Sequence, residues 1–191
     1  MLWKNDQVSR VETEKIIEIA GDCLSLAGDY VELGCYKGDT SLLLAEVLQE
    51  TDKKLWLYDS FEGLPPKTEA DSSELGRDFV AGALAVSKRE VKARFLRAGL
   101  RVPVIKKAWF EELAETDLPD KIAWAFIDAD LYASIRVGLK LVENKMVAGG
   151  VILVHDYVNP ALPGVAKAVD EWAEQKHKEI IVFQSLAIIR I

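Results

Sequence analysis

The sequence predicts a single α/β domain built on a Rossmann-like, mostly parallel sheet of seven strands whose last strand is antiparallel. Strand-like apolar runs alternate with helix-like segments along all 191 residues, which is the pattern of βα units. Several of these runs are continuously apolar, as expected of parallel strands covered on both faces. Near the end, only Gln184-Ser185 separates two strand-like runs, and so short a link permits only an antiparallel hairpin.

The first third of the chain is expected to contain two helices and two strands. Residues 1–29 form an amino-terminal helical segment, because apolar residues between Ile16 and Leu24 recur on one face of a helix over about Val11–Ala27. The same patterns then predict a strand over Tyr30–Leu33, a helix over Thr40–Glu50 and a strand over Leu55–Tyr58.

The least regular stretch of the sequence is Ser60–Gly82, which contains Pro65, Pro66 and many charged residues. It is longer than an ordinary connection, so we expect it to be helical in part or to be a mobile functional segment. A helix over Lys88–Ala98 follows, and its mixture of basic, acidic and apolar residues indicates a solvated amphipathic face. We therefore expect residues 60–100 to form a lid or an acceptor-binding insertion within the single domain.

The second half of the chain continues the alternation. Gly149-Gly150 leads into a strand, and Pro163 suits the first position of a helix. The predicted elements are strands over Val102–Ile105 and Ile122–Ile127, a helix over Ala133–Glu143, a strand over Val151–Val154, a helix over Pro163–Lys176, and strands over Glu179–Phe183 and Leu186–Arg190. No internal repeat is present, so one domain over residues 1–191 accounts for the chain.

Composition narrows the classes of partner. The formal charge of −7 and the pI near 5.0 disfavour nucleic acid, whose phosphates require clustered Lys and Arg. Cys23 and Cys35 have no metal-site spacing and form no disulfide framework. The first residues lack the apolar stretch of a signal peptide, and no run approaches the roughly 18 apolar residues that span a bilayer. We expect a reduced, cytoplasmic protein that binds neither membranes nor nucleic acids.

Polar residues follow four of the predicted strands directly. The clearest case is the buried run Ile122–Ile127, which ends in Asp128 and Asp130. Buried charge is costly, so these carboxylates should lie where the strand leaves the core. In an open α/β sheet this edge, at the carboxyl ends of the strands, is where ligands bind. Asp128 is the candidate catalytic residue, whereas Asp130 is expected to cap the following helix.

The turn after the first strand contains Gly34 and Gly38. Gly34 permits close approach of a ligand to the backbone, and Gly38 permits close contact where the next helix begins. The spacing is not G-x-G-x-x-G, and Tyr36 stands where a pyrophosphate would need a glycine. Glu32, near the strand end, can accept hydrogen bonds from a cationic amino group. An ordinary βα turn remains the alternative interpretation of this motif.

Asp59 ends the second strand, 25 residues after Gly34. This offset is close to the roughly 20 residues at which an acidic residue contacts ribose hydroxyls in nucleotide-binding α/β folds. The two features together favour a nucleoside without pyrophosphate, and S-adenosylmethionine meets that description. Trp109 and Phe110 follow the third strand, where they either stack on the adenine ring or contact the hydrophobic core.

Asp128, His155 and Asp156 form the candidate metal site. Oxygen ligands from several strand ends suit Mg²⁺ or a similar hard cation, which would lower the pKa of a substrate hydroxyl. An imidazole ligand better suits Mn²⁺ or Fe²⁺, and a site without metal is the third alternative. Asp128 then acts as general base or holds the metal. Asp156 can instead be a turn residue before Asn159-Pro160, and His177 lies in a charged helix end where it is expected to be solvated.

These motifs resemble the macrocin O-methyltransferase family. The resemblance covers about Tyr30–Trp172 and rests on four segments: Glu32-x-Gly34-x-x-x-Gly38-x-x-Ser41, Asp59-Ser60-Phe61-Glu-Gly-Leu-Pro65, Asp128-Ala-Asp-Leu-Tyr-x-Ser134 and His155-Asp156-Tyr157. It implies a class I methyltransferase fold that uses S-adenosylmethionine to methylate sugar hydroxyls of natural products. Gly34 and Asp59 would then contact the cofactor, together with neighbours in the first two segments. Asp128 would bind a divalent metal and serve as base, and positions 155 and 156 would complete the metal site.

The chain departs from this family at two points. The family usually has Asp-Asp-Tyr where this sequence has His155-Asp156-Tyr157, which leaves the identity of the metal open. Family members also tend to be longer at the amino terminus, where extra helices help to cover the substrate, so the substrate is not carried over. The expected activity is methyl transfer from S-adenosylmethionine to a hydroxyl of a small molecule, a sugar being one candidate, assisted by a divalent cation such as Mg²⁺.

Two rival functions share the same predicted sheet. One is an NAD(P)-dependent oxidoreductase, disfavoured by the missing glycine pattern and by the terminal hairpin. The other is a non-catalytic nucleoside-binding protein with a degenerate metal site. The sequence leaves the acceptor unidentified, and a homodimer is one of the oligomeric states that it leaves open.

Overall fold

Seven strands form one sheet in the order β3-β2-β1-β4-β5-β7-β6 in the computed structural model, which describes residues 7–191. The strands are β1 (Asp29–Leu33), β2 (Leu55–Asp59), β3 (Val104–Lys107), β4 (Ile122–Ile127), β5 (Met146–Val154), β6 (Ile181–Phe183) and β7 (Leu186–Arg190). The pairings among β1 to β5 are parallel, whereas β7 is antiparallel to both of its neighbours. The predicted fold class is therefore confirmed, including the antiparallel last strand.

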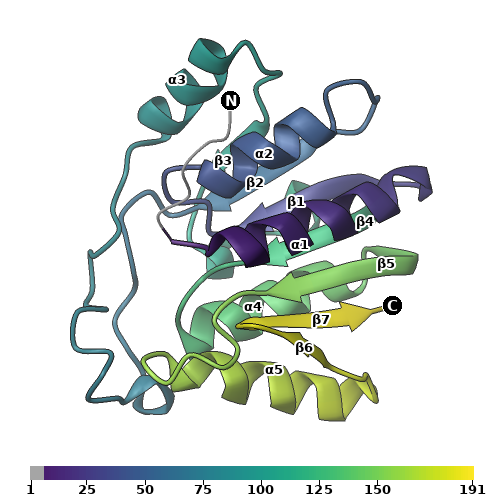
Figure 1. Cartoon of the computed structure of the whole chain (residues 1–191). Helices are drawn as coiled ribbons and strands as arrows, with labels where there is room; N and C mark the ends of the chain where they lie inside the picture. Colours follow the sequence, from purple (N-terminus) through teal and green to yellow (C-terminus); the bar gives the residue numbers. More distant parts are fainter. Residues whose placement is uncertain (1–6) are drawn as a thin grey trace.

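Helices cover both faces of this sheet (Figure 1). They are α1 (Arg10–Asp22), α2 (Asp39–Val47), α3 (Lys88–Ala98), α4 (Tyr132–Glu143) and α5 (Pro163–Lys176). The buried residues of α1, α2 and α3 belong to one hydrophobic cluster and those of α4 and α5 to another, one on each side of the sheet. Within residues 7–191, no helix has both the length and the apolar character needed to cross a bilayer.

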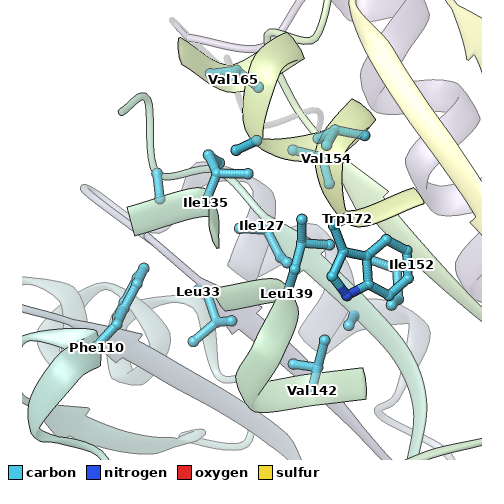
Figure 2. Close-up of a cluster of buried hydrophobic side chains, with 14 of the residues drawn as sticks. Leu33, Phe110, Ile127, Ile135, Leu139, Val142, Ile152, Val154, Val165 and Trp172 are labelled. Carbon is cyan, nitrogen blue, oxygen red and sulfur yellow. The ribbon is translucent and has the colours of Figure 1, made fainter. Parts of the chain in front are cut away.

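The centre of the sheet is buried on both faces. All six residues of β4 are buried, which explains why its sequence is apolar without alternation. Figure 2 shows the cluster on the α4–α5 side, where Ile127 and Ile152 of the sheet lie among Leu139 and Trp172 of the helices. Burial of a side chain of this size stabilises the fold by about 1.5–3 kcal/mol, so this cluster holds the strand ends in fixed positions.

Helix boundaries follow local signals closely. Ser9 and Glu12 form a reciprocal capping box at the start of α1, and Ser87 and Glu90 form another at the start of α3. Pro163 opens α5 as predicted, because its missing N–H is not needed in the first turn. The helical segment predicted over residues 1–29 is tested only from Gln7, since its first six residues lie outside the described part.

Three strands differ from their predicted bounds by two residues or more, and one of them is β6, which begins at Ile181 instead of Glu179. β3 begins two residues later than predicted, at Val104, and β5 begins five residues earlier, at Met146, so that Gly149-Gly150 lies inside the strand. The glycines remain in the strand because their backbones pair with the chain end: the Gly149 N–H donates to the carbonyl of Ile191, and the Ile191 N–H donates to that of Gly150. This pairing involves residues far along the chain, so the local pattern could not show it.

The connection between β2 and α3 runs as a long excursion along one edge of the molecule (Figure 1). Its base is closed by reciprocal backbone hydrogen bonds, since Leu64 N–H donates to Ala83 O and Gly82 N–H donates to Leu64 O. Within it lies a short 3₁₀ turn, Glu69–Asp71, so the expectation of a partly helical segment is confirmed. The excursion reaches the start of α5, where Ser73 Oγ donates to Pro160 O.

Candidate active site

The carboxyl ends of β1, β2, β3, β4 and β5 meet at one edge of the sheet. The strand order reverses between β1 and β4, and ligands bind at such a switch point in open α/β sheets. There the Asp128 N–H donates to Leu33 O at 2.9 Å, which holds the two strand ends together. Gly34 has a φ of +87°, and a Cβ on it would lie 2.0 Å from Asp128 O. Only glycine fits, because its neighbour is backbone that cannot give way.

A first cavity, which we call the Trp109 cavity, lies over the ends of β1, β2 and β3. Its volume is about 70 Å³, and its lining includes Gly34, Asp59, Ser60 and Trp109. Phe110 contributes one edge but is otherwise buried in the hydrophobic cluster (Figure 2). The sequence left open whether these two aromatic residues stack on a ligand or contact the core. In the structure Trp109 is available for stacking, whereas Phe110 mainly contacts the core.

A second cavity, the His155 cavity, has a volume of about 140 Å³ and lies over the ends of β1, β4 and β5. Its lining includes Glu32, Asp128, His155 and Asp156. The two cavities adjoin, because both contain the same five residues: Gly34, Tyr36, Leu84, Asp128 and Asp130. This arrangement can hold two molecules with their reacting groups side by side.

Backbone in the left-handed region is concentrated around these cavities. Five of the seven non-glycine residues with positive φ in the described chain lie at or next to the cavity walls: Tyr36, Phe61, Leu84, Asp130 and Asp156. Each such conformation costs on the order of 1–3 kcal/mol and persists only where its surroundings enforce it. Their gathering at one place supports the assignment of this edge as the functional site.

Asp59 organises the loop after β1. Its Oδ2 accepts hydrogen bonds from the backbone N–H groups of Cys35 and Tyr36, both at 3.0 Å, and its Oδ1 accepts from the N–H of Phe61 at 2.7 Å. An ionised carboxylate offers about four acceptor positions, so this geometry leaves about one for a ligand. The predicted ribose contact therefore shares Asp59 with a structural role that the sequence did not show.

Glu32 is buried, and only 2% of its surface is exposed, although it reaches the wall of the His155 cavity. Burial raises its pKa to about 8; the nearby carboxylates of Asp128 and Asp59 add to this, and the hydrogen bond from Ser41 opposes it. The Ser41 hydroxyl donates to Glu32 Oε2 at 2.5 Å. A cation placed beside Glu32 would favour its ionised form, which suits the predicted contact with an amino group.

The predicted metal residues lie together. Asp128, His155 and Asp156 each present a ligand atom within 4.8 Å of the others. His155 Nδ1 is 3.1 Å from Asp128 Oδ1 and 3.2 Å from Asp156 Oδ2. Neighbouring ligands of an octahedral ion with bonds of about 2.1 Å lie about 3 Å apart, so these separations fit a divalent cation. One imidazole and two carboxylates suit Mn²⁺ or Fe²⁺ better than Mg²⁺.

Asp156 makes the turn contact considered for it and also borders the candidate metal site. Its Oδ2 faces His155, while its Oδ1 accepts a hydrogen bond from the Asn159 side chain at 2.9 Å. The turn contact thus fixes the carboxylate that borders the candidate metal site.

Three carboxylates surround His155, which is 5% exposed. Asp128 and Asp156 face Nδ1, and Glu12 Oε2 lies 3.9 Å from Nε2 on the other side of the ring. Burial alone would lower the pKa of His155, but these carboxylates outweigh burial and raise it well above its usual value. The ion pair with His155 in turn lowers the pKa of Glu12. His177, by contrast, is exposed at the end of α5, as predicted.

The predicted capping role of Asp130 is wrong. The cap position of α4 is Leu131, and the first N–H of the helix, on Tyr132, donates instead to Asp71 Oδ1 at 2.7 Å. Asp130 lines both cavities, and its carboxylate has no hydrogen-bond partner among residues 7–191. Burial and the charges of Asp128 and Asp156 raise its pKa well above the ordinary value. Its φ of +59° lies in the left-handed region, whereas a residue that caps the start of a helix has extended backbone.

Several predicted cofactor residues support the site from outside the cavities. Gly38, Ser41 and Phe61 line neither cavity. Gly38 begins α2 with a φ of +79°, and a Cβ there would lie 3.3 Å from Val91, so its role is close contact between helices. The Ser41 hydroxyl donates a hydrogen bond to Glu32, and Phe61 is buried in the core.

Comparison with known proteins shows which protein family this sequence matches. A family model described as Macrocin-O-methyltransferase (TylF) matches residues 12–184. The 8-demethyl-8-(2,3-dimethoxy-alpha-L-rhamnosyl)-tetracenomycin-C 4'-O-methyltransferase of Streptomyces olivaceus is 32% identical over 139 residues, which are 68% of this chain and 53% of that protein. The demethyldecarbamoylnovobiocin O-methyltransferase of Streptomyces niveus is 30% identical over 164 residues, 78% of this chain and 59% of that protein.

Solved structures agree with this grouping. The O-methyltransferase NovP superposes with a TM-score of 0.82 at 27% identity, covering 94% of this chain and 78% of that chain. An O-methyltransferase from Bacillus cereus in complex with SAH shares the fold, with a TM-score of 0.69 at 14% identity over 99% of this chain and 84% of that chain. The chain spans only 53% and 59% of the lengths of the two curated relatives.

Proposed function

Because this chain belongs to the macrocin O-methyltransferase family, we propose that it transfers the methyl group of S-adenosylmethionine to a hydroxyl of a sugar-bearing small molecule. The observation that carries the proposal is the pair of adjoining cavities. They share Asp128 and Asp130 at their junction. The name of the Streptomyces olivaceus relative gives its substrate as a rhamnosyl compound. A methyl donor and a hydroxyl acceptor need this adjacency, because transfer requires their reacting atoms in line.

We assign the nucleoside part of the cofactor to the Trp109 cavity. Asp59 offers its remaining acceptor position to the ribose, Ser60 lies beside it, and Trp109 offers a ring for stacking. Gly34 and Glu32 then face the amino-acid part at the junction with the His155 cavity. When bound, S-adenosylmethionine supplies an activated methyl group whose bond to sulfur breaks as the bond to the acceptor oxygen forms.

We further propose that Asp128, His155 and Asp156 hold a divalent cation. Their mutual distances and donor types support it, with Mn²⁺ favoured by the imidazole and Mg²⁺ by the family resemblance. Such a cation lowers the pKa of an acceptor hydroxyl and orients it.

The acceptor proton passes to a carboxylate at the junction. Asp128 is the proposed base, and Asp130 is the second candidate, because its carboxylate lines both cavities without a hydrogen-bond partner in the described range. Residues 60–100 remain the proposed lid or acceptor-binding segment, since Gly63, Leu64 and Leu84 lie in the cavity walls. The cytoplasmic location, the homodimer and the absence of membrane and nucleic-acid partners remain predictions from the sequence.

Transfer of a labelled methyl group tests this proposal. The protein is incubated with methyl-labelled S-adenosylmethionine and a panel of glycosylated and non-glycosylated hydroxyl compounds, with Mn²⁺, Mg²⁺ or a chelator. We expect label in a glycosylated acceptor and a higher rate with a divalent cation. Binding of S-adenosylhomocysteine without transfer to any acceptor would favour the rival function of a non-catalytic nucleoside-binding protein.

A further inference from the structure

Glu12 is a buried carboxylate that lines neither cavity. It lies in the first turn of α1, with 5% of its surface exposed. Four donors hold it in place: its Oε2 accepts from the N–H and the hydroxyl of Ser9 at 3.1 and 2.5 Å, and its Oε1 accepts from those of Ser185 at 2.9 and 2.5 Å. Glu12 thus ties the start of α1 to the turn between β6 and β7.

The same carboxylate faces the active site through His155. Its Oε2 lies 3.9 Å from His155 Nε2, whereas Nδ1 of that ring faces Asp128 and Asp156. The ring of Phe126 also packs edge-on against the imidazole, with 6.3 Å between the two ring centroids. The imidazole is therefore held between a fixed negative charge on one side and the candidate metal ligands on the other.

We propose that Glu12 is a positioning residue that fixes the His155 ring with Nδ1 toward Asp128 and Asp156. A carboxylate held 3.9 Å from Nε2 favours the ring orientation in which Nε2 faces Glu12 and Nδ1 lies on the opposite side. Carboxylates behind histidine ligands set ring orientation in metal sites in this manner. The inference rests on the proposed function only in placing His155 in the active site.

Glu12 also has ordinary structural uses, which the test must separate from this one. The capping box accounts for its contacts with Ser9, and a negative charge in the first turn of a helix is favourable by itself. Neither use depends on the nature of residue 155. A coupling between Glu12 and His155 is therefore what distinguishes positioning from capping.

Nitrogen NMR of the histidine rings measures that coupling directly. The chain has two histidines, so ¹⁵N-histidine labelling gives two sets of ring signals, and His177→Asn assigns them. We expect Glu12→Gln to shift and broaden the His155 ring signals, while Ser185→Ala, which keeps the charge, leaves them near the parental positions. Unchanged His155 signals in a folded Glu12→Gln protein would overturn the proposal.

A double-mutant cycle provides a second measurement that needs no methyl transfer. The loss of thermal midpoint caused by Glu12→Gln is compared between the parent and a His155→Asn background. Positioning predicts a smaller loss in the His155→Asn background, whereas equal losses would show that Glu12 serves only the cap and the turn. If the Glu12→Gln protein does not fold, Glu12→Asp is used in its place. Its side chain is one methylene shorter, so the carboxylate lies farther from His155 Nε2. Neither result depends on activity, so a failure of the proposed function would be seen separately.

Discussion

At the scale of single residues, the site contains several acidic side chains that differ in burial, in pKa and in hydrogen-bond partners. Glu32 is buried with a pKa near 8, Asp59 is bound by three backbone N–H groups, and Asp128 faces His155. The same functional group holds a loop at Asp59, and we propose that it binds the cofactor at Glu32 and takes part in the chemistry at Asp128. The difference lies in desolvation and in the partners that each carboxylate meets.

Glu32 should make stability depend on pH. Its folded-state pKa, about 8, lies above the unfolded value, about 4.5, so the folded state binds a proton more tightly. The stabilising contribution is full below pH 4.5 and is lost as the pH rises through 8, because the unfolded state ionises more easily. With about 1.4 kcal/mol per pKa unit, we expect a loss of several kcal/mol in the free energy of unfolding.

Urea unfolding of the parent and of Glu32→Gln at a series of pH values between 4.5 and 8.5 measures this contribution. The variant carries no titrating group at this position, so the difference between the two proteins should change steadily across the range. Parallel stability curves would refute the assignment.

Asp59→Ala should weaken binding of S-adenosylhomocysteine by about tenfold or more, in line with roughly 1–3 kcal/mol for a lost charge-assisted hydrogen bond. Part of the effect comes from the loops after β1 and β2, because two N–H groups in the first and one in the second lose their acceptor. Calorimetric titration measures the affinity, and Asp59→Asn, which keeps one oxygen, serves as the matched control. Unchanged affinity in Asp59→Ala would remove Asp59 from the cofactor site.

Asp128→Asn should lower kcat by about 10²–10⁴-fold, the range of general acid–base catalysis, with little change in cofactor affinity. Asp130→Asn is the matched variant, because it lies at the same junction of the cavities. The larger loss identifies the proton acceptor, and full activity in Asp128→Asn would exclude this residue as base. Circular dichroism confirms that both variants fold.

At the scale of elements, the excursion between β2 and α3 is held down by one buried side chain. Asp71 is 1% exposed and accepts hydrogen bonds from the N–H and hydroxyl of Thr68 at 2.8 and 2.7 Å and from the N–H of Tyr132 at 2.7 Å. Gly164 lets this carboxylate approach α5, since a Cβ there would lie 2.0 Å from Asp71 Oδ1. Asp71 therefore joins the excursion to the starts of α4 and α5.

Asp71→Ala should destabilise the protein by about 1–3 kcal/mol, because the part-buried N–H groups of Thr68 and Tyr132 lose their acceptor. It should also release the excursion, so limited proteolysis between residues 60 and 87 should become faster. Asp78→Ala, a substitution at an exposed position in the same excursion, is the control. Equal cleavage rates in the two variants would show that Asp71 does not anchor this segment.

At the scale of the whole molecule, the sheet brings the site together. Residues from five strand ends border two adjoining cavities at the reversal of strand order between β1 and β4. The two hydrophobic clusters on either side of the sheet keep those ends in register. A ligand bound at this junction would contact several strand ends and would therefore stabilise the folded state of the whole domain.

Ligand screening by thermal shift tests the choice of cofactor at this scale. A ligand present at 100 times its Kd stabilises the folded state by about 2.7 kcal/mol, and we expect this from S-adenosylhomocysteine. NAD and NADP should give no shift, since the turn at Gly34 lacks the glycine pattern for a pyrophosphate. A shift with NAD(P) alone would favour the oxidoreductase.

Much of the site could be predicted because it follows strands. Asp59, Asp128 and His155 stand directly at the ends of apolar runs, so the parallel sheet had to bring them to one edge. The residues that local patterns missed or misassigned make contacts with residues that are distant in the sequence. Asp130 resembles a helix cap by position, but Asp71, which lies 61 residues before Tyr132, accepts the hydrogen bond from the first N–H of α4 instead. Glu12 reads as a capping residue, yet it meets Ser185, 173 residues along the chain.

By itself, the sequence determined the α/β class, the order of the elements, the antiparallel end of the sheet and the sheet edge at which the candidate site residues gather. These follow from periodicity and from the residues next to each strand, which are local properties. Only the tertiary structure decided how the acidic groups divide their roles and that Glu12 stands behind His155. Such contacts join distant segments whose approach depends on how helices and sheet fit together, and no local pattern encodes that fit.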